Sequence, residues 1–215
     1  MIPLLHDFDG ETVLIVGGGR VGARKARRFV REARVVVVSP EFADADFGGA
    51  ERVRATIGRD DVDEWFDRLD PALVVAATND AGLNAAIEAA ARDRCVLVNR
   101  TDTHGGRDRG SVVVPATVRD DPVVVSISTG GASPALSKHL RERLEDELAG
   151  AGAMAELTGY LREELQSRDV SPAERRDLVR EVVRSDDVWT VLRTGNTNPR
   201  QIARELLRSR TPHDE

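Results

Sequence analysis

The sequence of 215 residues predicts an α/β fold: a doubly wound parallel sheet, followed by a small α+β segment and a helical C-terminal region. In the first half, short and almost continuously apolar runs alternate with amphipathic helical patterns, which is the order of a repeated βα unit. A cluster of three consecutive glycines separates the first apolar run from the first helical pattern. In the second half, strand patterns end near residue 128, and only helical patterns follow.

The elements of the first half follow from these patterns in chain order. Nearly continuous hydrophobicity is typical of strands that are buried on both faces of a parallel sheet. Four runs have this character: ETVLIVG (11–17), ARVVVVSP (33–40), ALVVAATN (72–79) and RCVLVNRT (94–101). Three intervening segments have helical length and amphipathic spacing: 20–33, 60–70 and 80–93. We therefore predict a sheet of at least four parallel strands with helices between them.

The second half has a different pattern. SVVVPATVRDDPVVVSIS (111–128) predicts two strands around a polar turn at 120–122, and residues 134–150 predict one long helix. From residue 151 onward only helices are expected. One of them begins at Ser171 with a capping box that includes Glu174, and another begins at the Thr197-Asn198-Pro199 segment.

Composition and charge exclude several classes of protein. Hydrophobic residues make up 40% of the chain, and no apolar run reaches the roughly 18 residues of a membrane span. The N-terminus lacks the basic start of a signal peptide, so we expect a cytoplasmic protein. The net charge of −6 disfavours general nucleic-acid binding. The single Cys95 excludes an internal disulfide and is expected to be a small core residue, and the four scattered histidines predict no stable metal site.

The glycine cluster predicts a dinucleotide site. G-x-G-x-x-G lies directly between the first strand and the first helix, the position that it occupies in Rossmann-like folds. The first two glycines let the backbone turn and approach a pyrophosphate, the third lets helix and strand pack closely, and the helix N-terminus offers amide hydrogens. The alternative is a purely structural glycine turn. The predicted cofactor contacts in this segment are Gly17, Gly18, Gly19, Arg20, Val21 and Gly22.

Two further strand ends complete the predicted cofactor site. The second strand ends in Ser39, Pro40 and Glu41, which we expect near the adenosine ribose. No basic residue at this tip is placed to receive a 2′-phosphate, so the sequence favours NAD over NADP. Thr78 and Asn79 follow the third strand and are expected against the cofactor, whereas Asp80 is expected to cap the next helix.

Four motifs, in this order, resemble a known family: VGGGRVGARKA, AATNDAGLN, VNRTD and SISTGGASPALSKHLRERLE. They look like the siroheme-synthase N-terminal family, that is, precorrin-2 dehydrogenases, some of which are also sirohydrochlorin ferrochelatases. The resemblance covers residues 1–150 well, and residues 151–215 only as a helical region of suitable length. It implies an NAD-binding domain at 1–112, a dimerisation and substrate segment at 113–150, and a helical domain at 151–215.

The resemblance also implies an activity: the NAD-dependent oxidation of precorrin-2 to sirohydrochlorin, in siroheme biosynthesis, by a homodimer. Asp102 matches the family's catalytic aspartate. Because it follows a strand, it should stand at the carboxyl edge of the sheet, where partial burial could raise its pKa and let it accept a proton. From the sequence alone, a solvated loop aspartate is the competing interpretation.

The tetrapyrrole substrate carries several carboxylates, so the site needs groups that bind anions. The predicted substrate-binding residues are Ser128, Thr129, Gly130, Gly131, Ser133 and Lys138. The glycines of this loop would let a ligand come close to the backbone, and we expect free amide hydrogens at the start of the following helix to bind its anionic groups. Arg100, Arg107 and Arg109 are further candidate partners for carboxylates.

Metal insertion is the second activity of some relatives in this family. It would need a transient metal encounter, which Asp102 and His104 could serve. The loop from Asp102 to Pro115 departs from the family pattern, and we therefore expect dehydrogenation without efficient ferrochelation.

Two other classes of function stay open at this point. One is a regulatory NAD-sensing module, such as those that gate ion transport, but it leaves the STGGASP segment and the paired middle strands without a purpose. The other is a catalytically silent scaffold that binds tetrapyrrole and delivers it to a separate enzyme. Turnover of precorrin-2 with NAD separates these interpretations from the enzyme.

Overall fold

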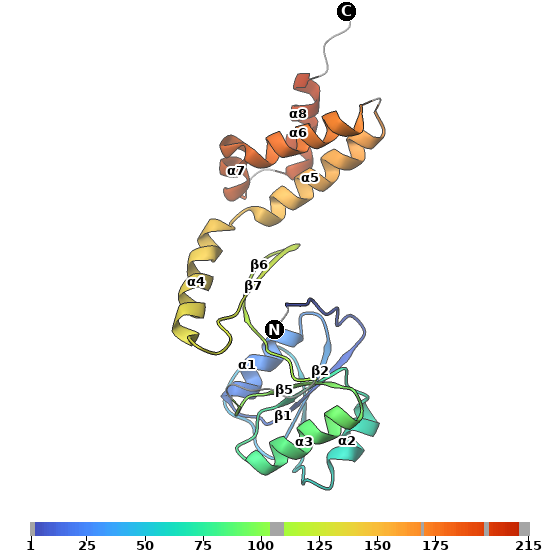
Figure 1. The fold of residues 1–215 in the computed structure, drawn as a ribbon, viewed down its shortest axis with the longest axis vertical. Helices are drawn as coiled ribbons and strands as arrows, with labels where there is room; N and C mark the ends of the chain where they lie inside the picture. Colours follow the sequence, from blue (N-terminus) through green and yellow to red (C-terminus); the bar gives the residue numbers. More distant parts are fainter. Residues whose placement is uncertain (1–2, 104–109, 169, 196–197, 211–215) are drawn as a thin grey trace, which may run out of the picture. The chain divides into compact units, whose positions relative to one another are not determined.

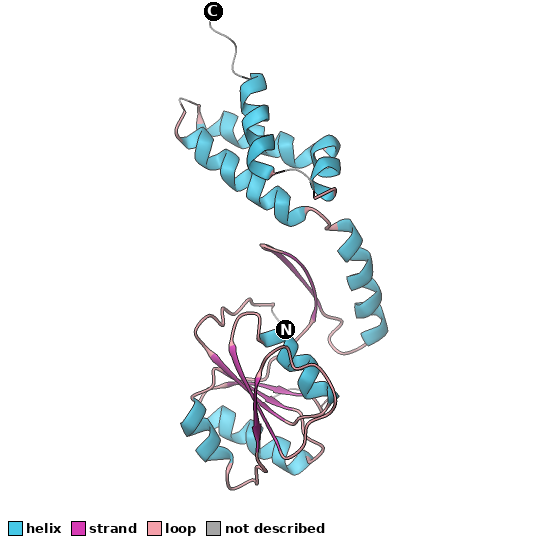
Figure 2. Cartoon of the chain, turned by 180° about the vertical axis from the view of Figure 1, so that it is seen from behind, coloured by secondary structure: helices cyan, strands magenta, loops and turns pink. Residues whose placement is uncertain are grey.

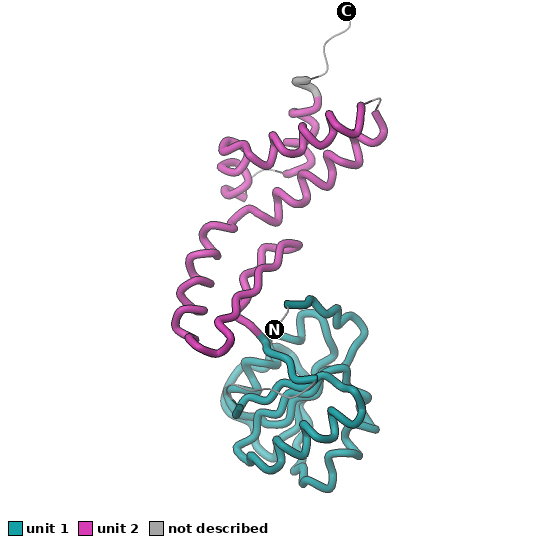
Figure 3. The backbone as a smooth tube through the Cα atoms, viewed as in Figure 1, with its two compact units in different colours: residues 1–114 teal, residues 115–215 magenta. Residues whose placement is uncertain are grey.

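A computed structural model describes residues 3–103, 110–168, 170–195 and 198–210, without the side chains of 208–210 (Figure 1). The chain divides into two compact units, Met1–Val114 and Pro115–Glu215 (Figure 3). The first contains a parallel sheet with helices, and the second contains a β-hairpin and helices (Figure 2). Among the described helices, none is long and apolar enough to cross a membrane. The predicted separation of 113–150 from 151–215 stays a prediction.

The first unit is the predicted doubly wound sheet. Its elements are β1 (Thr12–Val16), α1 (Arg20–Phe29), β2 (Arg34–Ser39), β3 (Glu51–Arg54), α2 (Val62–Leu69), β4 (Leu73–Ala76), α3 (Ala81–Asp93) and β5 (Leu97–Arg100). All neighbouring strands are parallel, in the order β3-β2-β1-β4-β5. The chain order reverses between β1 and β4, and in such sheets ligands bind at the carboxyl ends of the strands beside this point.

Both faces of the sheet are covered, which explains the continuous apolar runs. Along β1, Val13 and Ile15 pack with Ala23 and Ala26 of α1, whereas Leu14 on the other face packs with residues of α2 and α3. Fully burying a side chain of this size contributes about 1.5–3 kcal/mol. The inner strands β1, β2 and β4 are therefore apolar at almost every position rather than at every second one.

The edge strand β3 was not predicted. Its sequence ERVR has three charged residues, and only Val53 packs against the core. Glu51 forms an ion pair of 2.8 Å with Arg34 on the neighbouring strand. Charged residues are typical of sheet edges because they discourage pairing with other chains. The prediction failed because one face and one edge of this strand meet solvent, so the apolar signal is lost.

Cys95 is exposed, so its predicted place in the core is wrong. It follows α3 with a left-handed φ of 58°, and its N–H donates to the carbonyl of Arg92 over 3.1 Å. A residue in this conformation ends a helix by turning the chain sharply, which directs the thiol outward. The strand therefore starts at Leu97, two residues later than the thiol.

The second unit begins with the predicted hairpin and continues with helices. Its elements are β6 (Ala116–Asp120), β7 (Val123–Ile127), α4 (Pro134–Glu147), α5 (Ala151–Gln166), α6 (Pro172–Arg184), α7 (Asp186–Arg193) and α8 (Pro199–Arg210). β6 and β7 are antiparallel. The first strand starts later than predicted, because Val112 pairs instead with Val98 of the first unit, its N–H donating over 2.8 Å. The capping box of Ser171 and Glu174 is confirmed.

The C-terminal helices share a core of their own. Leu157, Leu161 and Leu165 form the buried stripe of α5, at helical spacing, and they pack with residues of α6, α7 and α8. The start of α5 is also fixed to the hairpin, since the Gly152 N–H donates to the carboxylate of Asp120 over 3.1 Å. An anion at a helix N-terminus stabilises the helix. The hairpin turn and the helices of this unit are therefore packed together.

The packing of α1 on β1 makes a testable prediction at Gly22. A Cβ built there would lie 2.0 Å from the backbone oxygen of Gly17, so α1 would have to move away from the strand. We expect Gly22→Ala to lower the free energy of unfolding by about 3 kcal/mol, measured by urea denaturation. Gly19→Ala is the matched control, because its Cβ would meet nothing within 4 Å. It should cost about 0.5 kcal/mol, the loss of a weak N-cap preference. Equal losses in the two variants would contradict this account.

Candidate functional site

A cleft of about 630 Å³ lies at the carboxyl ends of the strands of the first unit. Its walls are the loop after β1, the loop after β2, the segment after β3 and the loop after β4. The predicted residues that line it are Gly17, Gly18, Gly19, Ser39, Pro40, Glu41, Thr78 and Asn79. The topology thus brings three separate predicted segments to one cleft, beside the point where the strand order reverses.

The glycine loop closes against its neighbours so tightly that side chains are excluded at two positions. Gly17 has a φ of 121°, and a Cβ there would lie 2.3 Å from the carbonyl oxygen of Ala77. A Cβ on Gly18 would lie 2.3 Å from the carbonyl oxygen of Glu41. Gly19 differs, because its φ is −75° and the space around it is open. The protein itself therefore requires Gly17 and Gly18, whereas the open side at Gly19 leaves the N-terminus of α1 accessible to a ligand.

Three predicted cofactor contacts do not line the cleft: Arg20, Val21 and Gly22. They belong to the first turn of α1, and Gly22 is buried against β1. Several lining residues were missed: Phe42, Ala43, Ala55, Thr56, Ile57 and Leu83. Thr56 and Ile57 follow the unpredicted edge strand, and their position could have been found only by recognising that strand.

Asp102 is held by a two-point interaction with Arg100. The Arg100 Nε donates to Oδ1 over 3.1 Å, and Nη2 donates to Oδ2 over 2.7 Å. The third nitrogen, Nη1, donates to Glu88 of α3 over 2.9 Å. The side chain of Arg100 is only 12% exposed, so two carboxylates share one poorly solvated guanidinium. Glu88, which lies two helical turns into α3, was not predicted from the sequence. Arg100, a candidate partner for substrate carboxylates, already binds two carboxylates of the chain.

The expected rise in the pKa of Asp102 is wrong. The hydrogen bonds from Arg100 hold the pKa of Asp102 below its ordinary value, with a further contribution from the Asn84 side chain. Partial burial acts in the opposite direction but does not prevail. The same interaction with Asp102 raises the pKa of Arg100. Asp102 is therefore an ionised, oriented carboxylate at neutral pH, and it can accept a proton without first losing one.

Asn84 connects this carboxylate to the cleft. Its side chain is fully buried, and its Oδ1 accepts a hydrogen bond of 2.7 Å from the hydroxyl of Thr78, which lines the cleft. Its Nδ2 donates to the Thr78 carbonyl over 3.1 Å. Asp80 caps α3 as predicted, accepting from the N–H groups of Gly82 and Leu83, and these bonds lower its pKa. The loop after β4 is thus held by the bonds between Thr78 and Asn84 and by the cap that Asp80 forms on α3.

Asn99 is a second buried amide at this edge of the sheet. Its Nδ2 donates to the carbonyl of Val112 over 2.7 Å, while its Oδ1 has no partner among the residues that the structure describes. The predicted candidates His104, Arg107 and Arg109 lie outside the described residues. Within the described residues, no group of three or more His, Cys, Asp or Glu side chains could hold a metal ion.

The predicted substrate loop lies in the second unit, before α4. Ser133 caps the helix, since its Oγ accepts from the N–H of Leu136 over 3.2 Å. The loop uses other amides internally: Gly130 donates to the Ser128 hydroxyl, and Ser133 donates to the Thr129 hydroxyl. These amides are therefore not free for an anion, contrary to expectation.

Two features of the same loop still allow a ligand to approach. Gly130 and Gly131 have φ values of 64° and 89°, with open space where side chains would stand. Lys138 faces solvent and forms an ion pair of 3.8 Å with Glu142. Exposed pairs of this kind contribute little to stability, so the ammonium group can exchange partners.

The fold and the cleft define a Rossmann-type dinucleotide-binding protein. A family model described as "Putative NAD(P)-binding" matches residues 4–116, which include the sheet and every residue that lines the cleft. A second model, described as "Sirohaem biosynthesis protein central", matches residues 120–147, from the hairpin to the end of α4. The two models together cover both predicted binding segments.

Known relatives give the particular family. A precorrin-2 dehydrogenase of Methanosarcina barkeri is 34% identical over 195 residues, which are 87% of this chain and 85% of that protein. Siroheme synthase 2 of Aeromonas hydrophila is 36% identical over 183 residues, and this chain spans 36% of its length. The solved structure of "SirC, precorrin-2 dehydrogenase" shares the fold, with a TM-score of 0.67 at 23% identity over 97% of this chain and 100% of that one. The chain belongs to the precorrin-2 dehydrogenase family.

The interaction between Asp102 and Arg100 predicts how stability depends on pH. Because the pKa of Asp102 is lowered in the folded chain, its contribution to stability is present above the ordinary carboxyl pKa of 3.8 and is lost as pH falls through the lower folded value. We expect Asp102→Asn to be less stable than the wild type at about pH 7, with the difference shrinking below pH 3.8.

Urea denaturation of both proteins across this pH range measures the difference. Asp67→Asn is the control, since Asp67 forms a 3.3 Å ion pair with Arg94 while its side chain stays 73% exposed. This variant should stay close to the wild type at every pH. A difference for Asp102→Asn that stays constant down to the most acidic sample would contradict the assignment.

Proposed function

We propose that this chain oxidises precorrin-2 to sirohydrochlorin with a nicotinamide cofactor bound in the cleft of the first unit. The observation that carries the proposal is the open position at Gly19, at the N-terminus of α1, within a cleft connected through Thr78 and Asn84 to an ionised Asp102. Membership of the precorrin-2 dehydrogenase family supports the substrate. The cofactor and the proton acceptor would then both lie at the carboxyl edge of the sheet.

In this proposal, different residues bind the cofactor and accept the proton. The amides at the start of α1 would bind the pyrophosphate, with Gly17 and Gly18 allowing the backbone to approach it. The nicotinamide supplies a hydride acceptor when it is bound. The reaction removes two hydrogens from the substrate, one as hydride and one as a proton, and Asp102 accepts the proton and passes it to solvent. Arg100 and Glu88 orient the carboxylate for this transfer.

The cleft favours NAD over NADP. Glu41 lines it at the tip of β2, where a carboxylate can accept hydrogen bonds from ribose hydroxyls and would repel a 2′-phosphate. Among the described lining residues there is no arginine or lysine. Arg54 pairs in register with Ser39 across the edge of the sheet but does not line the cleft. Comparing the two cofactors at equal concentration tests this preference.

The loop before α4 is the proposed site for the substrate carboxylates. Gly130 and Gly131 leave open space for a ligand, and Lys138 supplies a positive charge on the next turn. The hydroxyls of Ser128, Thr129 and Ser133 brace the loop rather than point freely outward. Their proposed role is to hold the glycine backbone in its left-handed conformation.

We propose that the second unit forms a homodimer through residues 113–148. β6 and β7 form a two-stranded sheet, which is marginally stable on its own. Helix α4 packs on this hairpin, yet none of its residues is buried, and Leu136 is 47% exposed. A second copy of the chain, related by a two-fold axis, would cover this apolar surface with an identical one.

Metal insertion lies outside the proposed function, because the sequence from Asp102 to Pro115 departs from the family pattern. A sensor that binds NAD without turnover, or a scaffold that binds tetrapyrrole alone, would require no oriented carboxylate. The ion pair of Asp102 therefore favours the enzyme over both alternatives.

Gly19→Asp tests the cofactor site. The new carboxylate would cap α1 and neutralise its positive end, so the fold should stay as stable as the wild type. The same carboxylate would repel the pyrophosphate, and we expect the Kd for NAD to rise by about 100-fold or more, measured by isothermal titration calorimetry. Gly19→Ala is the control and should weaken binding less. Unchanged NAD affinity in Gly19→Asp would remove the cleft from the proposal.

Asp102→Asn tests the proton acceptor. An amide of the same shape cannot accept the proton, so kcat for precorrin-2 oxidation should fall by about 10²- to 10⁴-fold while NAD binding is retained. The appearance of NADH and of the sirohydrochlorin absorption spectrum measures the rate. Asp67→Asn removes an exposed carboxylate and should leave kcat unchanged. Wild-type turnover in Asp102→Asn would show that another group accepts the proton.

Leu136→Glu tests the dimer. The substitution places a charge on the exposed face of α4 without removing a buried contact, and a carboxylate is tolerated in the first turn of a helix. We expect the wild type to sediment as a dimer and the variant to shift towards a monomer. Leu4→Glu, at a position 86% exposed in the first unit, is the matched control and should remain dimeric. A monomeric wild type at all practical concentrations would contradict the proposal.

A further inference from the structure

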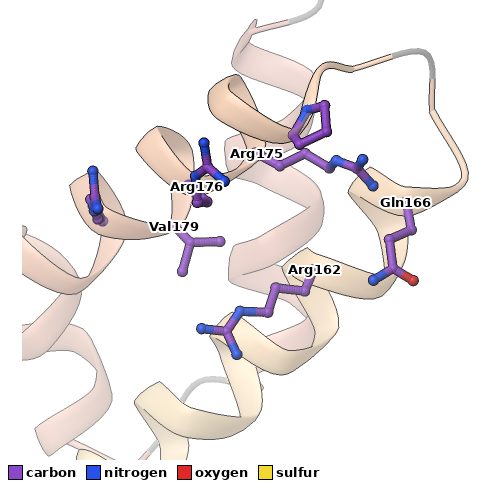
Figure 4. A pocket seen from close by; sticks show the side chains of 7 residues that line it. Arg162, Gln166, Arg175, Arg176 and Val179 are labelled. Carbon is purple, nitrogen blue, oxygen red and sulfur yellow. The ribbon is translucent and has the colours of Figure 1, made fainter.

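A second cleft, of about 500 Å³, lies between α5 and α6 in the C-terminal helices (Figure 4). Four of its lining residues are arginines: Arg162 on α5, and Arg175, Arg176 and Arg180 on α6. Its apolar part is formed by Pro172 and Val179. Among the described lining residues there is no Asp or Glu. Positive charge is therefore concentrated in this cleft, although the net charge of the chain is −6.

Helical spacing explains how the arginines come together. Residues four apart lie on the same face of a helix, so Arg176 and Arg180 form one row of α6, while Arg175 and Val179 form the next. On α5, Arg162 and Gln166 are also four residues apart. Figure 4 shows these two residues on one helix, and Arg175, Arg176 and Val179 on the helix that faces it. A ligand between the helices would meet guanidinium groups from both sides.

These arginines have few carboxylates close to their guanidinium groups. Within the described residues, Arg162, Arg175 and Arg176 form no ion pair, and Arg180 has only a 3.4 Å contact with Asp177, whose side chain is 73% exposed. Such a pair contributes little. By contrast, Arg100 binds two carboxylates. Several unpaired positive charges in one cleft repel one another, and a bound anion would remove this repulsion.

The residues that line the cleft limit the chemical class of ligand that it can bind. A guanidinium group presents paired N–H donors that match a carboxylate or a phosphate. Val179 lines the cleft and is buried, and Pro172 adds a second apolar surface. A ligand that uses both features has an apolar body with several anionic groups at its rim. A volume of this size is typical of small-molecule sites rather than of a nucleic-acid groove.

We propose that the cleft between α5 and α6 binds a small polycarboxylate with an apolar body, the chemical class to which the tetrapyrrole product belongs. The choice of that ligand rests on the proposed function, whereas the anion site itself rests on the four arginines. The cleft would hold a second tetrapyrrole molecule, away from the glycine-lined cleft of the first unit. It would thereby keep product bound to the protein after oxidation.

The test counts binding sites for sirohydrochlorin on the full-length protein by absorbance titration. The variant Arg175→Gln/Arg176→Gln removes two charges from the cleft, and the control Arg31→Gln/Arg204→Gln removes two charges from exposed positions outside the cleft and outside residues 113–148. We expect the cleft variant to lose one binding site per chain, or to weaken it by about tenfold or more, while the control matches the wild type. Thermal unfolding of all three proteins checks that the helices remain folded.

Two results would overturn the proposal. One is equal binding of sirohydrochlorin by the wild type and the cleft variant. The other is binding of inorganic tripolyphosphate in the cleft, lost in the variant, without any arginine-dependent binding of sirohydrochlorin. Turnover of precorrin-2 is measured separately in the same variants and should equal that of the wild type. An inactive wild type with arginine-dependent binding would reject the proposed function and leave the anion site in place.

Discussion

Close backbone packing around the glycine loop is the constraint on which the cleft of the first unit depends. Gly17 approaches the end of β4, Gly18 approaches the loop after β2, and Gly22 approaches Gly17 itself, each within 2.3 Å of the place where a Cβ would stand. These contacts bring the start of α1 to the point where the strand order reverses. The helix N-terminus then faces a space bounded by three strand ends. At Gly19, by contrast, a Cβ would meet nothing within 4 Å, so the space at the helix N-terminus is open.

The carboxyl edge of the sheet combines rigid positioning with a controlled charge. Arg100 is the last residue of β5. Its guanidinium group binds both Asp102 and Glu88 of α3, so it joins a strand, a loop and a helix. Its hydrogen bonds keep Asp102 ionised despite partial burial. Asn84 also interacts with Asp102, and its Oδ1 accepts a hydrogen bond from Thr78, which lines the cleft. This network orients the carboxylate of Asp102 and lowers its pKa instead of raising it.

Arginines are used in two ways, one seen in the first unit and the other in the C-terminal helices. In the first, arginines such as Arg34, Arg94 and Arg100 form ion pairs with carboxylates on neighbouring elements. In the second, α5 and α6 pack through a leucine-rich stripe and leave arginines on the facing rims of a cleft. The stability of the helices comes from the buried stripe, so the rims are free to carry charge for another purpose. The same helices can thus form a core and a binding surface.

The sequence by itself determined the α/β class, four of the five sheet strands, the glycine loop and most of the helices. It did so because strands buried on both faces are apolar throughout and because caps such as Ser171 and Asp80 act locally. It also determined three of the segments that line the cleft. Arg20 and Val21 were included with them because they lie inside the glycine motif, and Gly22 because it is the motif's third glycine, but none of the three lines the cleft.

The tertiary structure decided what depends on partners distant in the chain. The edge strand β3 exists because β2 offers it hydrogen bonds, and its charged sequence gives no local signal. The exposure of Cys95 follows from a single left-handed turn after α3. The pKa of Asp102 falls rather than rises because the fold orients Arg100 towards it and braces that arginine with Glu88. Apolar periodicity and helix caps are properties of neighbouring residues, whereas edge pairing and the charge of a carboxylate are set by groups that only folding brings together.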